Sequence, residues 1–243
     1  MMMGNIMVTG ATSGIGEAMV NLFVSRGAKV VAVGRNREKL DAINLKFGDY
    51  VSTFQLDLKE MNAIKLVFDS CKSDGVMFDG IVHCAGITLN CPLRVNNCIQ
   101  TEEMLRVNFG VLADICCIAS SKRYVNEGAS IVAMSSTASL CAAKGTATYA
   151  ASKAAVNSLV KTAAVELVPR RIRINAIAPS MVNTPMYERT IEEIPNMLNV
   201  VNSQQPLGLI EPESISKIAA WLMSDEARYI TGAIIPVGAG FVL

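Results

Sequence analysis

The sequence is poor in histidine, in tryptophan and in net charge. Among 243 residues it has one histidine, His83, and one tryptophan, and its formal net charge is +1. A charge this close to zero argues against electrostatic recognition of nucleic acid or of an anionic membrane. His83 has no cysteine or carboxylate cluster beside it in the sequence, so we expect no metal site.

Long apolar runs and paired cysteine motifs are missing as well. No apolar run reaches the roughly 18 residues of a membrane-spanning helix, and the first residues lack the basic start of a secretory signal. The seven cysteines show no paired spacing. Reduced thiols are typical of the cytosol, so we expect a cytoplasmic protein.

What the sequence does have is a regular alternation of two patterns. Short apolar segments predict strands at 5–9, 29–34, 51–56, 80–83, 130–135, 173–178 and 233–237, and helical periodicity predicts helices at 14–26, 37–47, 61–72, 101–123, 148–167 and 212–223. Unbroken Val, Ile and Ala segments are typical of parallel strands that are covered on both faces. Residues 1–243 are therefore predicted to form a single α/β domain: a doubly wound, Rossmann-like parallel sheet of about seven strands with helices on both faces. Such sheets bind ligands beyond the carboxyl ends of their strands.

A glycine-rich loop follows the first predicted strand and opens the first helix. It reads Gly10-Ala11-Thr12-Ser13-Gly14-Ile15-Gly16. Gly10 suits a tight turn, Gly14 lets the backbone approach a pyrophosphate, and Gly16 permits close packing of helix on strand. We predict a dinucleotide site here, with Thr12, Ser13 and Ile15 as further contacts; a purely structural turn is the alternative.

The end of the second predicted strand indicates which nicotinamide cofactor is bound. It reads Gly34-Arg35-Asn36-Arg37, without the acidic residue that holds the ribose hydroxyls in NAD sites. A guanidinium there binds a 2′-phosphate in bidentate fashion, which favours NADP(H) with Arg35 and Asn36 as contacts. Solvated arginines at a helix start are the alternative.

Two later strand ends complete the predicted cofactor site. Asp57, followed by Leu58, comes after the third strand and either accepts a hydrogen bond from the adenine amine or caps the next helix. Ala85 and Gly86 form a small turn after the fourth strand that lets the cofactor pass close to the backbone.

One tyrosine and one lysine lie a single turn apart in the predicted helix 148–167. Tyr149 and Lys153 share a helix face, and a cation beside a phenol lowers its pKa from about 10. From this segment alone, an ordinary surface pair is the alternative.

Taken together, these motifs resemble the single-domain short-chain dehydrogenase/reductase family. The resemblance is carried over nearly the whole chain by Thr9-Gly10-x-x-x-Gly14-x-Gly16, Ala85-Gly86, Asn108, Ser136 and Tyr149-x-x-x-Lys153. It implies that Tyr149 is the acid/base, that Lys153 lowers the tyrosine pKa and binds the nicotinamide ribose, and that Ser136 polarises the substrate carbonyl. Asn108 would interrupt its helix to help hold a water. Pro179, Val182 and Thr184 would contact the cofactor.

The sequence departs from the family pattern at three places. His83-Cys84 stands where the family usually has asparagines, Pro179-Ser180 where it has Pro-Gly, and Val237-Gly238-Ala239-Gly240 where it has Asp-Gly-Gly. We expect His83 to be a packed strand-end residue and Cys84 to alter hydrogen bonding at the sheet centre. Since serine resists a positive φ, the loop at Ser180 is expected to take another path.

Two segments are predicted to form the substrate site. Residues 181–207, with Pro185, Pro195 and Pro206, predict a mobile apolar lid, and residues 87–98 predict a second wall. "AGIT", "YAASKAA" and "YITG" resemble the β-ketoacyl-acyl-carrier-protein reductases, which implies reduction of a 3-oxoacyl thioester. The same resemblance implies docking of an acidic acyl carrier protein on Arg170, assisted by Lys122 or Arg123; charge at a helix end is the alternative.

Two other functions stay open at this stage. One is reduction or oxidation of another ketone, sugar or secondary alcohol, and the other is a catalytically silent NADP(H)-binding sensor. The intact set of Ser136, Tyr149 and Lys153 argues against the sensor. The family also implies a homotetramer, or a dimer, through helices 101–123 and 148–167, whose small residues Ala150, Ala151, Ala154 and Ala155 allow close packing.

Overall fold

The strands form one parallel sheet. The structure, a computed structural model, describes residues 4–194 and 197–241, so Pro195 of the predicted lid lies outside the described residues. Within this part the sheet has the order β3-β2-β1-β4-β5-β6-β7 and all its pairings are parallel. The strands are β1 (Asn5–Thr9), β2 (Lys29–Gly34), β3 (Val51–Gln55), β4 (Phe78–His83), β5 (Val125–Met134), β6 (Arg173–Pro179) and β7 (Ile234–Val237). The order reverses between β1 and β4, which opens a crevice at their carboxyl ends.

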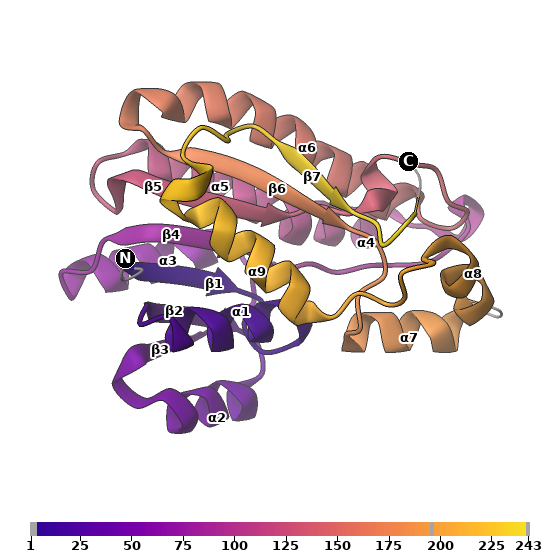
Figure 1. The fold of residues 1–243 in the computed structure, drawn as a ribbon, viewed down its shortest axis with the longest axis horizontal. Coiled ribbons are helices and arrows are strands. Elements are labelled where there is room, and N and C mark those ends of the chain that lie inside the picture. The colour runs from indigo at the N-terminus through magenta and orange to yellow at the C-terminus, as the bar shows by residue number, and fades with distance from the viewer. Residues whose placement is uncertain (1–3, 195–196, 242–243) are drawn as a thin grey trace.

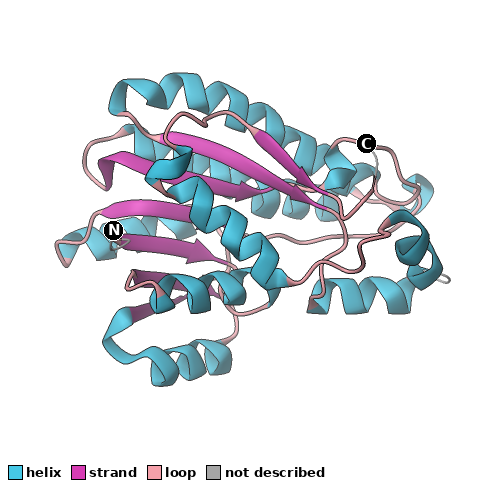
Figure 2. Cartoon of the chain, viewed as in Figure 1, coloured by secondary structure: helices cyan, strands magenta, loops and turns pink. Residues whose placement is uncertain are grey.

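Helices cover both faces of this sheet (Figures 1 and 2). They are α1 (Gly14–Ser25), α2 (Arg37–Phe47), α3 (Ala63–Ser73), α4 (Cys98–Leu105), α5 (Val111–Ser120), α6 (Ala147–Leu167), α7 (Pro185–Glu193), α8 (Met197–Gln204) and α9 (Pro212–Met223). One hydrophobic core joins the sheet to α3, α5 and α6, and the other joins it to α1, α2 and α9. Helices α7 and α8 lie beyond the carboxyl ends of the strands (Figure 1). The predicted doubly wound fold is confirmed.

Successive strand residues explain why the sheet is buried on both sides. In β1, Ile6 and Val8 pack into the core of α1, α2 and α9, whereas Met7 packs into the core of α3, α5 and α6. Because side chains alternate between the faces of a strand, a sheet with two covered faces needs apolar residues at nearly every position. This is the physical origin of the unbroken Val, Ile and Ala segments.

The long helix predicted at 101–123 is interrupted. It begins at Cys98, where the Asn97 side chain accepts from the Gln100 N–H at 2.9 Å, and it ends at Ser120. Between α4 and α5 a π-helical turn spans Arg106–Gly110, and the Val111 N–H donates to the Arg106 carbonyl. Apolar periodicity does not reveal such a turn, because one extra residue in the ladder shifts the helix face without changing the composition.

The segment predicted as a lid contains two helices that the sequence pattern did not predict. Thr184 caps α7 by accepting from the Tyr187 N–H at 3.3 Å, and Pro185 occupies the first turn. Proline disfavours a helix interior but suits the first helical position, so the proline that suggested a loop marks a helix start.

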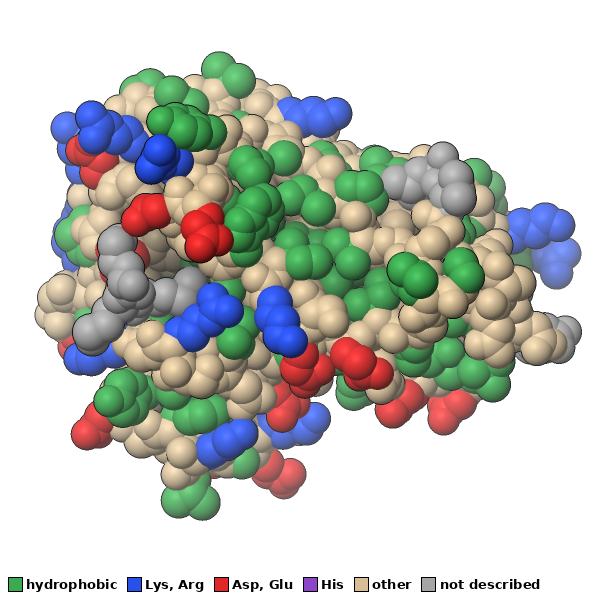
Figure 3. All heavy atoms as spheres, in the orientation of Figure 1, with side chains coloured by type: hydrophobic (Ala, Val, Ile, Leu, Met, Phe, Trp, Pro, Cys, Tyr) green, Lys and Arg blue, Asp and Glu red, His purple; other side chains and the backbone are tan. Residues whose placement is uncertain are grey.

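The face of the molecule that carries β7 and α9 is apolar. β7 is an edge strand, and Ile234, Ile235 and Val237 are only half buried. Figure 3 shows hydrophobic side chains gathered over this face. An edge strand with half-exposed apolar residues is a surface that proteins usually cover.

Arg170 has a structural role. Its guanidinium donates to the Ala119 carbonyl, to the Ser121 carbonyl at 2.7 Å and to the Val125 carbonyl at 2.6 Å. It therefore neutralises the carboxyl end of α5 and holds the start of β5. The alternative of charge at a helix end therefore fits Arg170, and three of its five N–H donors are used within the chain. Its role in docking an acyl carrier protein stays a prediction.

We expect Arg170→Lys to lower the free energy of unfolding by about 2 kcal/mol, because a lysine ammonium cannot reach all three carbonyls and leaves buried acceptors unpaired. Arg171→Lys is the matched control, since its Nε lies 3.7 Å from Glu127 and its side chain is 82% exposed. Urea unfolding measures both variants; equal losses would contradict this role for Arg170.

Candidate active site

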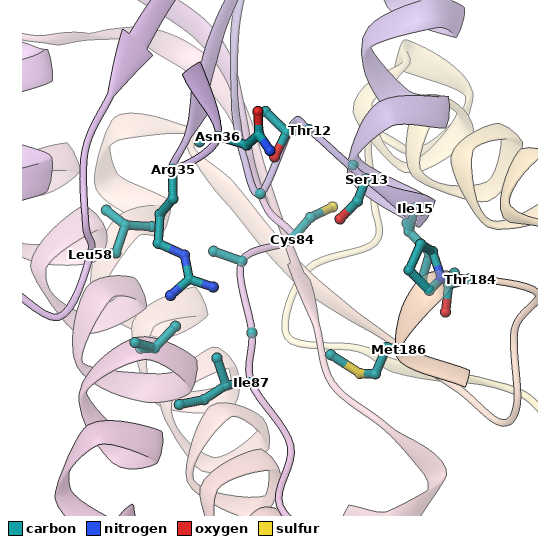
Figure 4. A pocket seen from close by; sticks show the side chains of 18 of the residues that line it. Thr12, Ser13, Ile15, Arg35, Asn36, Leu58, Cys84, Ile87, Thr184 and Met186 are labelled. Carbon is teal, nitrogen blue, oxygen red and sulfur yellow. The ribbon is translucent and has the colours of Figure 1, made fainter. Parts of the chain in front are cut away.

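A cavity of about 480 Å³ lies at the carboxyl ends of the strands. It brings together thirteen of the residues predicted for the cofactor: Gly10, Thr12, Ser13, Gly14, Ile15, Gly16, Arg35, Asn36, Asp57, Leu58, Ala85, Gly86 and Thr184. Figure 4 shows side chains from the first loop, from the end of β2 and from the start of α7 around one space. Segments far apart in the sequence thus form a single groove at the point where the strand order reverses.

The glycine loop presents unpaired amides to this groove. Gly10 has φ +70°, and a Cβ on it would lie 2.8 Å from the Ala85 nitrogen, so only glycine fits where β1 and β4 end side by side. Ser13 precedes α1 with an extended backbone, and no side chain in the described part of the chain caps this helix. Helix N–H groups without a cap are a site for a phosphate oxygen, so the loop fits the pyrophosphate of a dinucleotide.

At the end of β2, only Arg35 of the two arginines in Gly34-Arg35-Asn36-Arg37 reaches the groove. Arg35 is exposed and extends into the cavity (Figure 4). Arg37 instead pairs with Asp41 one turn along α2, with 3.0 Å between Nε and Oδ1. Asn36 caps α2 by accepting from the Lys39 N–H at 2.9 Å, and Lys39 is a second cation lining the cavity that the sequence analysis missed.

Asp57 lines the groove and also stabilises a turn. Its Oδ1 accepts from the Lys59 N–H at 3.0 Å, two residues further on. Helix α3 begins only at Ala63. Asp57 therefore caps a turn and not the helix, as an aspartate commonly does in an Asx turn.

Ser136, Tyr149 and Lys153 come together beside the groove. Ser136 follows β5, and its hydroxyl lies close enough to the Tyr149 phenol to influence the pKa of that group. Lys153 is buried, and its Nζ lies 5.8 Å from the centre of the Tyr149 ring and donates to the Met134 carbonyl at 2.8 Å. A Cβ on Gly86 would lie 3.4 Å from that Nζ, so Lys153 lies directly beside a residue that lines the cavity.

The titration behaviour of the pair differs from the sequence-based expectation. Burial raises the pKa of Tyr149, and the neighbouring Ser136 hydroxyl offsets this only in part. Burial also lowers the pKa of Lys153 to about 8. The expected lowering of the tyrosine pKa is wrong in this structure, because desolvation of the phenolate is the largest effect on Tyr149, and the Lys153 ammonium donates to the Met134 carbonyl.

Asn108 lies in the π-helical turn and is fully buried. Its Oδ1 accepts from the Ile87 N–H at 2.8 Å, and its Nδ2 donates to the Ile87 carbonyl at 3.0 Å and to the Ser152 hydroxyl at 2.9 Å. The side chain thus holds both ends of one backbone residue in the loop that follows β4. Its role in holding a water stays a prediction.

His83 forms a second buried network next to Asn108. Its Nδ1 lies 2.9 Å from the Thr9 hydroxyl and its Nε2 lies 3.2 Å from the Val107 carbonyl. The Thr9 hydroxyl also accepts from the Ala85 N–H at 3.2 Å. Since a carbonyl only accepts, Nε2 carries the proton and Nδ1 accepts from Thr9. Burial, together with the Lys153 cation, lowers the pKa of His83 to about 3.

Comparison with known proteins agrees with this geometry. Residues 10–242 match the family model described as enoyl-(acyl carrier protein) reductase. The chain belongs to the short-chain dehydrogenase/reductase family.

Its relatives differ in the substrates that their names give. The chain is 32% identical over 241 residues to a 3-oxoacyl-(acyl-carrier-protein) reductase of Thermotoga maritima, covering 98% of this chain and 97% of that one. It is 32% identical over 247 residues to 3beta-hydroxysteroid dehydrogenase 1 of Eggerthella lenta, covering 98% and 93%. A solved 4-hydroxyisoleucine dehydrogenase complexed with NADH superposes with a TM-score of 0.87 at 27% identity, covering 98% of both chains.

The remaining predicted contacts of this short-chain dehydrogenase/reductase lie at the edge of the groove. Pro179 ends β6, and Val182 is buried in a bridge to Ile210; neither lines the cavity. Ser180 shows no positive φ, and its hydroxyl donates to the Gln205 side chain at 2.7 Å. Gln205 is itself buried and also accepts from the Met181 N–H at 2.9 Å, so it connects the far end of the segment predicted as a lid to the loop after β6.

The inner face of α7 is the largest part of the site that the sequence did not predict. Met186, Arg189, Thr190 and Glu193 line the cavity at helical spacing. Thr190 lies 3.5 Å from the Asn90 amide, so α7 meets the wall formed by residues 87–98. The sequence did not predict these residues because residues 181–207 were expected to form a loop, and a loop has no periodic face.

The sequence predicts neither a metal-binding group nor a membrane-spanning helix. In the described ranges, no group of His, Cys, Asp and Glu side chains is arranged to hold a metal ion, and no helix there is long and apolar enough to cross a membrane. All seven cysteines are free thiols.

The pKa of His83 predicts a loss of stability in acid. The unfolded chain takes up a proton near pH 6.5 and the folded chain only near 3, so lowering the pH below 6.5 favours unfolding. Between pH 7 and pH 5 this amounts to about 2 kcal/mol. We expect His83→Gln to remove this part of the pH dependence, as measured by urea unfolding at both pH values. If the variant and the parent lose the same free energy, the imidazole is not the titrating group.

Proposed function

We propose that this chain is an NADP(H)-dependent reductase that converts a ketone to a secondary alcohol, with a 3-oxoacyl thioester as its substrate class. The observation that carries the proposal is the position of buried Lys153, one helical turn from Tyr149 and directly beside Gly86, a residue of the dinucleotide groove. A binding module has no use for a phenol held in this way. This argues against a silent sensor.

The choice of NADP(H) rests on the end of β2. Arg35 and Lys39 line the cavity there, and the stretch Gly34–Arg37 contains no carboxylate to hold a ribose diol. Two cations favour a ligand with an additional phosphate. A relative complexed with NADH shows that the family also accepts the other cofactor, so cofactor preference is the first property to measure.

Tyr149 is proposed to donate the proton in the reduction. The bound nicotinamide would supply the hydride. A phenol with a pKa of about 10 or above is protonated at neutral pH, which is the form that donates a proton to a carbonyl oxygen. The Ser136 hydroxyl would donate to the same oxygen, and the Lys153 ammonium lies 5.8 Å from the centre of the Tyr149 ring.

The substrate class rests on the walls of the cavity and on the family relatives. Ile87 and Met186 provide apolar contacts that suit an acyl chain, beside the charged Arg189 and Glu193 of α7. Residues 181–207 are proposed to form the lid, within a single domain spanning 1–243. Because Arg170 uses three of its donors on backbone carbonyls, docking of an acyl carrier protein is proposed to rest mainly on exposed Lys122 and Arg123. A steroid or another secondary alcohol is the alternative substrate, favoured by the hydroxysteroid dehydrogenase relative.

Assembly and location complete the proposal. Ala151 and Ala154 of α6 are exposed, and the face of β7 and α9 is apolar (Figure 3), so two separate surfaces are available for pairing. Two independent two-fold contacts generate a homotetramer. The seven free thiols suit a cytoplasmic location.

Tyr149→Phe tests the reaction. In an assay that follows NADPH absorbance with a short 3-oxoacyl thioester, we expect loss of at least about a hundredfold in kcat, because general acid catalysis contributes roughly two to four orders of magnitude. Binding of NADPH, measured by fluorescence, should change little. If the parent binds NADPH but turns over no thioester, a panel of steroid, sugar and small ketones decides between another reductase and the sensor.

Arg35→Gln tests the cofactor. We expect a weakening of NADPH binding by about thirtyfold, corresponding to about 2 kcal/mol of charge-assisted hydrogen bonding, with NADH binding unchanged. Arg37→Gln is the matched control, since Arg37 pairs with Asp41 outside the cavity. Equal effects on the two cofactors would contradict the proposed 2′-phosphate contact.

A further inference from the structure

The π-helical turn leaves one backbone carbonyl without the partner that a regular α-helix would give it. In an α-helix the Val111 N–H would donate to Val107, but here it donates to Arg106. The Val107 carbonyl is therefore open to another donor in a buried part of the molecule, where an unpaired acceptor is costly. His83 lies 3.2 Å away and supplies that donor through Nε2.

The other ring nitrogen connects this turn to the first strand. Nδ1 accepts from the Thr9 hydroxyl, whose oxygen accepts from the Ala85 N–H. His83 and the Thr9 hydroxyl each donate one hydrogen bond and accept one, between the Ala85 N–H at one end and the Val107 carbonyl at the other, so the direction of every hydrogen bond is determined. His83 and Thr9 are both 0% exposed, which leaves no solvent to replace either contact.

The residue next to Val107 is the one that faces the reaction site. Asn108 holds the Ile87 backbone at both ends and contacts Ser152, and a Cβ on Gly86 would lie 3.3 Å from Asn108 Oδ1 and 3.4 Å from Lys153 Nζ. A shift of the turn therefore changes where Asn108, the loop after β4 and Lys153 lie relative to one another. A displacement of an ångström at such a site costs a large factor in rate.

We propose that His83 is a positioning residue for the reduction: its Nε2–H holds the Val107 carbonyl and thereby sets the π-helical turn that places Asn108 against Ile87. This inference rests on the proposed reductase function. It does not make His83 a catalytic residue, since the imidazole touches neither the cavity nor the Tyr149 hydroxyl.

Two variants separate the two ring nitrogens. The glutamine side chain is long enough to place an amide N–H where Nε2 lies in the parent. The shorter asparagine places its amide near the position of Nδ1, so it can contact Thr9 but not the Val107 carbonyl. We expect His83→Gln to retain at least about a third of kcat, and His83→Asn to lose about tenfold or more in kcat, with the Kd for NADPH and the KM for the ketone within about threefold of the parent for both.

Hydrogen exchange of the NADPH-bound enzyme provides a readout that does not need turnover. In His83→Asn we expect faster exchange of the Ile87 amide and of the amides of residues 107–112, with β1 and β4 protected as in the parent; His83→Gln should exchange like the parent. Parent-like exchange at Ile87 and kcat in His83→Asn would overturn the proposal. So would equal exposure of β1 and β4 in both variants, which would indicate a general loss of packing. If the parent binds NADPH but reduces no ketone, the proposed function fails, and the exchange contrast alone decides whether His83 sets the turn.

Discussion

The close approach of β1 and β4 at their carboxyl ends is the constraint on which the rest of the site depends. Thr9 and His83 are register partners there, and their side chains are hydrogen-bonded to each other. The two chains then separate, one into the glycine loop and the other into the turn at Ala85. Gly10 lies so close to Ala85 that no side chain fits between them. The cofactor groove exists because two parallel strands end side by side and their chains leave in opposite directions.

The active site combines polar groups that are buried at a cost. Lys153, Asn108 and Ser152 are almost fully removed from solvent, and each is satisfied by backbone or by another side chain. Burial has a chemical consequence: it lowers the pKa of Lys153 and raises the pKa of Tyr149. Desolvation thus favours the neutral form of both groups.

Departures from the family pattern are compensated by contacts that this chain makes for itself. Where the family usually has asparagine, His83 bridges β1 and the π-helical turn with its two ring nitrogens. Where the family usually has glycine, the Ser180 hydroxyl donates a hydrogen bond to the Gln205 side chain, which lies at the far end of the segment predicted as a lid. At His83 and at Ser180, the different residue type changes which atoms are hydrogen-bonded. The parallel sheet itself is kept.

Local pattern in the sequence determined the parallel sheet, its covering helices and the residues of the glycine loop, because alternation of strand and helix and the steric demands of glycine are properties of short segments. Tertiary structure decided which candidates face the groove. Arg35 and Arg37 are two residues apart, yet the turn of α2 directs only the first into the cavity and gives the second to Asp41. Arg170 has the charge expected of a docking residue, but carbonyls at the end of α5 and the start of β5 take up three of its donors. The pKa of Tyr149 is a third case: the neighbouring Lys153 is visible in the sequence, whereas the burial that raises the pKa exists only once the sheet, α6 and the loop after β4 have packed together.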